Sequence, residues 1–329
     1  MAFETVIGLE VHSQLLTRSK MYCSCAADYA STRPNSRVCP VCLGMPGVLP
    51  VINRKAVEFT IMTGMALNCA IAEHTKFDRK NYSYPDLVKG YQISQYDAPI
   101  ANNGWLDVDV NGTSHRVGIH RVHLEEDTAK LLHRHGMVES YSLVDMNRSG
   151  VPLMEIVSQP DMCSPEEARQ YLIKLRTILQ YLGVSTGNME EGSFRCDANI
   201  SLRPPGAPLP PAKVEIKNMN SFRAVFRAMT YEEERLGKLM TEGGRLVQET
   251  RGWVDERGET VLQRTKEEAH DYRYFPEPDL PPLEISASYV ENLRSRLPEL
   301  PDSRRQRYIN ELGLSDYDAG LVTQSRPLA

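Results

Sequence analysis

The stretch MEEGSFRCDANISLR, residues 189–203, decides the fold. Its polar and ionisable side chains fall on one parity: Glu191, Ser193, Arg195, Asp197, Asn199, Ser201 and Arg203. The other parity holds Gly192, Phe194, Cys196, Ala198, Ile200 and Leu202. Because successive side chains of a β-strand point to opposite faces, the stretch predicts a strand with one apolar face and one densely charged face.

Four more segments repeat this alternation: IGLEVHSQL (7–15), HRVHLEED (120–127), VPLMEIVS (151–158) and KVEIKNMNS (213–221). Their polar faces carry Glu10, His12, Gln14, Arg121, His123, Glu125, Asp127, Glu155, Glu215 and Lys217. One such face alone would be an ordinary solvated face of an antiparallel sheet. All five together are rich in acids, and like charges on neighbouring strands repel unless a positive group lies between them. We therefore expect a site for hard divalent cations such as Mg²⁺, which can bridge nucleotide phosphates.

The remaining pattern predicts an α+β fold with a mainly antiparallel sheet, because strands and helices do not alternate strictly. Strands are expected at 5–15, 106–111, 115–126, 139–147, 151–158, 193–203 and 213–218, and helices at 53–71, 164–183, 221–242, 287–297 and 302–312. Residues 74–105 look irregular. The helix at 164–183 has the strongest signals, with Ser164 as N-cap, Pro165 at the first position and Gly183 at the end.

A loop at 22–46 holds two close cysteine pairs, Cys23 with Cys25 and Cys39 with Cys42. This spacing is typical of a tetrahedral structural zinc site bound by four thiolates. The alternative is four reduced, free cysteines. The remaining cysteines, Cys69, Cys163 and Cys196, read as packing residues.

Composition places the chain among ordinary globular proteins. The 329 residues are 41% hydrophobic and 25% charged, with a net charge of −5, so overall charge gives no support to nucleic-acid binding. The sequence has neither a P-loop nor a dinucleotide-binding glycine motif. It shows no signal peptide and no apolar run of membrane-spanning length, and we expect a cytoplasmic protein.

Several segments, taken in order, resemble the B subunit of tRNA-dependent amidotransferases. They are ETVIGLEVHSQLLTRSKMYC, CLGMPGVLPVIN, KFDRKNYSYPDLVKGYQISQYD, HLEEDTAK, DMNRSGVPLMEIVSQPD, MEEGSFRCDANISLR, VEIKNMNSF, QETRGW and DYRYFPEPDLPPL. The resemblance covers nearly everything from residue 4 to residue 286. It implies a cradle-shaped domain related to glutamine synthetase, which binds Mg²⁺ and ATP and phosphorylates the side-chain carboxylate of Glu-tRNA(Gln) or Asp-tRNA(Asn).

The resemblance also implies a carbon–nitrogen ligase that uses glutamine as its nitrogen donor. Ammonia would come from an amidase A subunit, and a small C subunit would complete a heterotrimer. Zinc occurs in only some members of the family. The basic and aromatic segment at 76–92 would contact the tRNA acceptor end or line the ammonia channel, whereas composition alone favours a tyrosine-packed surface loop.

Site roles carried over from the resemblance coincide with the acidic strand faces. Catalytic roles fall to Glu10, His12, Glu125, Arg195, Lys217 and Lys80. Mg²⁺ ligands would be Glu10, His12, Glu125, Glu155 and Glu215, and cofactor contacts would come from Glu191, Asp197 and Asn199, with Glu190 as a further acid. For His12 the alternative is a satisfied strand histidine, and for Arg195 it is a salt bridge to Asp197.

Family members continue well past residue 329, so the resemblance predicts a C-terminally truncated chain. We expect a cradle domain at 1–293 and the start of a helical domain at 294–329. The sequence also leaves two other functions open. One is a non-catalytic scaffold that only positions tRNA and its partner proteins, and the other is a free-standing ligase acting on a small carboxylate.

Overall fold

A nine-stranded sheet forms the centre of the computed structural model, which describes residues 3–136, 139–265 and 272–329. The strand order is β14-β13-β12-β11-β1-β10-β7-β6-β2, and β12 and β13 are parallel while the other neighbours are antiparallel. The strands are β1 (Glu4–Gln14), β2 (Ala70–Ile71), β6 (Ala101–Val110), β7 (Thr113–Glu126), β10 (Pro152–Ser158), β11 (Phe194–Arg203), β12 (Val214–Met219), β13 (Glu249–Val254) and β14 (Glu259–Thr265). The prediction of a mixed fold with a mostly antiparallel sheet is confirmed.

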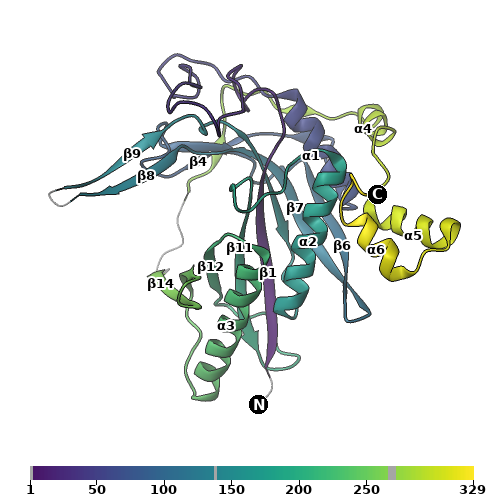
Figure 1. Cartoon of the computed structure of the whole chain (residues 1–329). Helices are drawn as coiled ribbons and strands as arrows, with labels where there is room; N and C mark the ends of the chain where they lie inside the picture. The colour runs from purple at the N-terminus through teal and green to yellow at the C-terminus, as the bar shows by residue number, and fades with distance from the viewer. Residues whose placement is uncertain (1–2, 137–138, 266–271) are drawn as a thin grey trace.

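Three smaller sheets surround this centre. β4 (Asp78–Asn81) pairs with both β5 (Tyr91–Ser94) and β15 (Phe275–Pro276), and β3 (His74–Thr75) pairs with β16 (Leu283–Glu284). The hairpin of β8 (Lys130–His135) and β9 (Ser140–Asp145) projects away from the body of the molecule (Figure 1).

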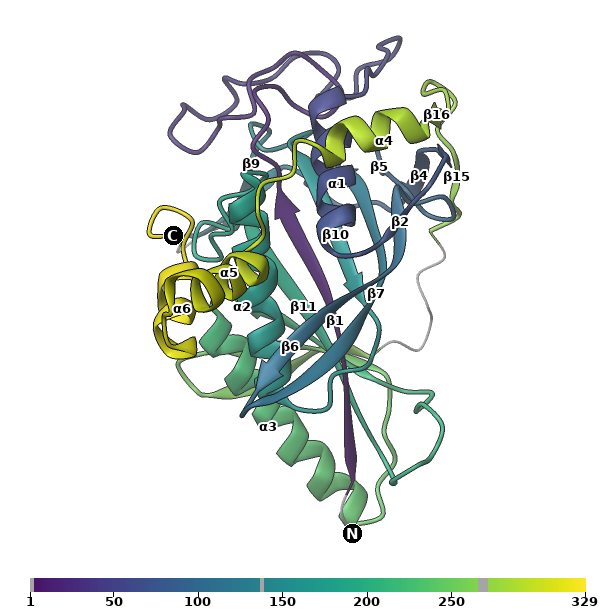
Figure 2. The same ribbon diagram turned by 90° about the vertical axis from the view of Figure 1, so that its right-hand side faces the viewer.

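Helices cover one face of the large sheet. They are α1 (Arg54–Ala66), α2 (Pro165–Leu182), α3 (Phe222–Thr241), α4 (Ala287–Arg294), α5 (Pro301–Leu312) and α6 (Asp316–Thr323). α1 packs on β6 and β7, α2 on β1 and β6, and α3 on β11 and β12, while α2 and α3 lie side by side (Figures 1 and 2). The apolar parities of the strands point into this layer, where Leu9, Val11, Ile200 and Ile216 are fully buried. The polar parities therefore lie on the face away from these helices.

The start and end signals of α2 act as the sequence predicts. The Ser164 hydroxyl accepts a hydrogen bond from the Glu167 N–H at 3.2 Å, and Gly183 ends the helix with a left-handed φ of 67°. The Glu167 carboxylate reaches one residue beyond the cap and accepts from the Cys163 N–H at 2.6 Å.

Elsewhere the elements differ from the sequence prediction. The first helix ends at Ala66 rather than residue 71, since Asn68 takes a left-handed φ of 56° and the chain enters β2. Residues 74–105, expected to be irregular, contain β3, β4, β5 and the start of β6. Strands of two to four residues are too short to show an alternation, and β3 and β4 pair with segments near residue 280. β8, β13, β14 and α6 were not predicted.

Candidate active site

A row of polar side chains crosses four strands of the large sheet. On β1, His12 lies opposite Arg195 of β11 on one side and opposite Glu155 of β10 on the other. Glu155 in turn lies opposite His123 of β7. Residues directly opposite each other in neighbouring strands project to the same face, so the register brings four predicted polar parities together.

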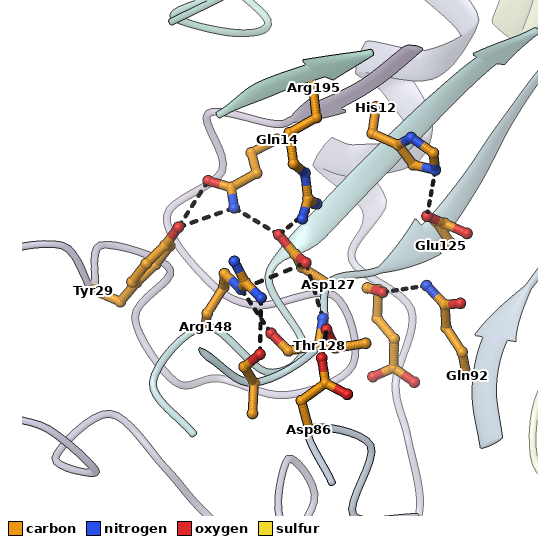
Figure 3. A network of polar contacts seen from close by, with 12 residues as sticks. His12, Gln14, Tyr29, Asp86, Gln92, Glu125, Asp127, Thr128, Arg148 and Arg195 are labelled. Atoms are coloured by element: carbon orange, nitrogen blue, oxygen red, sulfur yellow. Dashed lines mark hydrogen bonds and ion pairs between the residues drawn. The ribbon is translucent and has the colours of Figure 1, made fainter. Parts of the chain in front are cut away.

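Three side chains of this face form a compact cluster. The His12 Nε2 lies 3.4 Å from a Glu125 oxygen and 3.7 Å from a Glu155 oxygen (Figure 3 shows the His12–Glu125 contact). One ligand atom from each of the three lies within 4.8 Å of the others, although both carboxylates are nearly buried, with 3% and 6% of each residue exposed. Buried carboxylates this close repel each other, and a cation between them removes that cost. The donor set of two carboxylates and an imidazole therefore fits a divalent metal ion.

His123 completes the cluster from behind. Its Nε2 lies 3.0 Å from the same Glu155 oxygen that faces His12, and only 2% of the residue is exposed. Burial opposes ionisation of Glu155, but the two histidines outweigh it and lower the pKa of this carboxyl. No role was predicted for His123, although its place two residues before Glu125, on the same parity, was the signal for it.

Glu10 and Glu215 belong to a second polar group on the same face. Glu10 accepts a hydrogen bond from the Asn199 amide at 3.0 Å, and Lys217 contacts Asp197 at 2.5 Å and Glu215 at 3.2 Å. Burial disfavours the Lys217 ammonium, but Asp197 and Glu215 raise its pKa. The predicted ligands therefore divide into two neighbouring groups, and the Lys217 ammonium lies in the second of them.

Arg195 pairs with Asp127 rather than with Asp197, the partner considered from the sequence. The distance from its guanidinium to the Asp127 carboxylate is 3.0 Å. Figure 3 shows Asp127 at the centre of a polar network in which it also accepts from Gln14 at 2.7 Å and lies 3.6 Å from Arg148. Asp127 and Arg148 had no predicted role, and together they hold the Arg195 side chain in place beside His12.

The other predicted cations and acids lie at different distances from the cluster. Lys80, on β4, stands 4.9 Å from the centre of the Tyr272 ring. Burial disfavours its ammonium, yet the fields of Glu125 and Glu155 outweigh this and raise the pKa of Lys80. Glu190 and Glu191 are exposed in the turn before β11, which begins only at Phe194, so they lie outside the cluster.

The four cysteines of the loop at 22–46 also come together. Their sulfur atoms lie within 4.8 Å of one another, and those of Cys39 and Cys42 are 3.8 Å apart. Metal–sulfur bonds of about 2.3 Å give a tetrahedron with edges of about 3.8 Å, so the sulfur positions fit zinc. A hydrogen bond between Cys23 and Cys42 raises the pKa of Cys23 and lowers that of Cys42 to about 4, as expected for two sulfurs that share one proton.

Comparison with known proteins agrees with this architecture. A family model described as the GatB/GatE catalytic domain matches residues 5–291. The aspartyl/glutamyl-tRNA(Asn/Gln) amidotransferase B subunit of Dehalococcoides mccartyi strain CBDB1 is 66% identical over 99% of this chain and 67% of its own length. The B subunits of Thermomicrobium roseum and Moorella thermoacetica are 62% and 59% identical, over the whole of this chain and 68% and 69% of their own lengths.

The fold, its acidic sheet face and the family match define a GatB/GatE-type catalytic domain. The chain belongs to the family of aspartyl/glutamyl-tRNA(Asn/Gln) amidotransferase B subunits. None of the helices in the described ranges has the length and apolar character needed to cross a membrane.

Proposed function

We propose that the acidic sheet face is the site at which a tRNA-bound glutamate or aspartate is activated by ATP and converted to its amide. The observation that carries this proposal is the cluster of His12, Glu125 and Glu155, which joins three strands around a space suited to Mg²⁺. Bound there, Mg²⁺ would neutralise phosphate charge and orient the transferred phosphoryl group.

The reaction would proceed in two balanced steps. The side-chain carboxylate of the misacylated amino acid attacks the γ-phosphorus of ATP, ADP leaves, and an acyl phosphate forms. Ammonia then attacks the acyl carbon, phosphate leaves, and a proton passes from nitrogen to a base. Binding of the ammonia donor and of tRNA would place the reactants together, which is the main contribution of positioning in such transfers.

The chain's own cations surround this site in a way that supports the proposal. Arg195 and Lys80 flank the His12 cluster from β11 and β4 and are suited to bind phosphate oxygens. Lys217, held between Asp197 and Glu215, would do the same for the second group, in which Asn199 orients Glu10. Glu191, Asp197 and Asn199 remain our candidates for cofactor contacts.

The assembly we propose follows the names of the relatives. The chain would work with the amidase A subunit, the small C subunit and the misacylated tRNAs, in the cytoplasm. We assign residues 1–293 to a glutamine-synthetase-like cradle domain and 294–329 to the start of a helical domain. The packing of α4 on α1, and of α5 on α6, supports a division close to residue 294.

The test combines this chain with its A and C partners, ATP, Mg²⁺ and Glu-tRNA(Gln), with ammonium chloride as the nitrogen source. Direct ammonia bypasses the glutaminase, so Gln-tRNA and phosphate report on the sheet face alone. We expect product with the parent chain and none with Glu125→Gln, while assembly of the complex stays normal. Amidation that survives Glu125→Gln and Glu10→Gln would favour the alternative of a non-catalytic scaffold.

A further inference from the structure

Lys20 is the most deeply buried cation of the described chain that the site above does not use. None of its surface is exposed, and its side chain is among the largest fully buried ones. Within the described residues its ammonium makes one hydrogen bond, a long one of 3.4 Å to the Met146 carbonyl, and no carboxylate lies within ion-pair distance. A buried ammonium without a counter-charge is strongly disfavoured, so something negative must face it.

The negative charge lies in the thiol cluster. A Cβ placed on Gly150 would stand 3.6 Å from the Lys20 side chain and 3.7 Å from Cys42, so both side chains border one small space. The Lys20 N–H also donates to the Cys25 carbonyl at 2.9 Å, which ties the backbone of the lysine to the loop that carries the cysteines. The charge of Lys20 adds to the Cys23 hydrogen bond in lowering the pKa of Cys42.

The charge of a four-thiolate zinc site explains why a lysine would be buried there. Four thiolates and one Zn²⁺ carry a net charge of −2, which is costly in a protein interior unless a cation lies nearby. Groups outside the ligand shell tune metal affinity through such charges and hydrogen bonds. We propose that Lys20 is the counter-cation of the four-cysteine site and sets its affinity for zinc. This inference rests on the assignment of the cysteines as a zinc site.

The experiment measures zinc affinity by competition with a chromogenic chelator, on the purified full chain, for the parent and for Lys20→Met. Methionine keeps the length and volume of the side chain and removes its charge. We expect the zinc dissociation constant to rise by roughly 10- to 100-fold, as for other groups just outside a metal's ligand shell. Lys20→Arg, which keeps the charge, should retain zinc more tightly than Lys20→Met.

The matched control is Lys55→Met, which makes the same charge change on a side chain that is 45% exposed at the start of α1. Its zinc affinity should equal that of the parent. Where Lys20→Met does not fold, Lys20→Gln is compared with Lys20→Arg in its place.

Two results overturn the proposal, and they are distinguishable. Equal zinc affinity in parent and Lys20→Met means that Lys20 has only a packing role, although the zinc site itself stands. No zinc in the parent chain means that the four cysteines are not a zinc site, and the role of Lys20 fails with that assignment.

Discussion

Replacing Glu125 by glutamine should make the metal-free chain more stable while it removes the metal site. The Glu125 and Glu155 oxygens lie within 4.8 Å of each other. At an effective dielectric constant of about 20, two unit charges at that distance repel by about 3 kcal/mol. The positive charge of Lys80 offsets part of this repulsion, so we expect the free energy of unfolding of Glu125→Gln to rise by about 1–2 kcal/mol when metal is absent.

The assay is urea denaturation of parent and variant, first with a chelator and then with MgCl₂. Mg²⁺ at about 100 times its dissociation constant should stabilise the parent by about 2.7 kcal/mol, and Glu125→Gln should gain almost nothing.

The neighbouring acid provides a matched control. Glu126 is equally buried but points to the other face, where it pairs with Lys89 and accepts from the Ile93 N–H. Glu126→Gln should therefore lose stability with the chelator and keep the Mg²⁺ effect. The reasoning is refuted if Glu125→Gln is less stable than the parent with the chelator, or if Mg²⁺ stabilises both equally.

Three further predictions follow from separate parts of the chain. Cys39→Ser should release zinc and speed hydrogen exchange over residues 20–48 while the Mg²⁺ effect persists; equal zinc content in variant and parent would contradict it. Glu232 is fully buried between Arg235 at 2.7 Å and Arg251 at 3.1 Å, so Glu232→Gln should cost about 3–5 kcal/mol in urea denaturation, and a loss below about 1 kcal/mol would count against it. Burial opposes ionisation of Asp127, but Arg195 and Arg148 lower its pKa, so Asp127 stabilises the fold above its unfolded pKa of about 3.9 and this contribution is lost as pH falls. Asp127→Asn should flatten the acid side of the stability profile, and an unchanged slope would show the assignment to be wrong.

The acidic face was predictable because strand alternation is local. Each polar parity is visible within eight or nine residues, and the observed register then brings His12 opposite Glu155. The partition of the face was not predictable, because the separation of Glu10 and Glu215 from the His12 cluster depends on which strands are neighbours. The turn that leaves Glu191 outside the sheet depends on where β11 begins, and alternation continues past that point in the sequence.

The supporting residues were harder to predict for a different reason. Asp127 lies beyond the end of β7, and its partner Arg148 follows β9, so neither the strand pattern nor sequence distance joins them. Lys20 gives no sequence signal either, since a lysine beside a cysteine loop is usually exposed. The short strands β3 and β4 arise only because distant segments pair with them, and tertiary context decides such cases.

The central position of β1 has a consequence for the order of events during synthesis. β1 leaves the ribosome first, yet its two neighbours are β10 and β11, which lie far along the chain. Both of its edges stay unpaired until residues 152–203 have been made, and an unpaired apolar strand readily joins the wrong partner. His12 meets Glu155 only after that delay, so metal capture by a nascent chain would report that the middle of the sheet has closed.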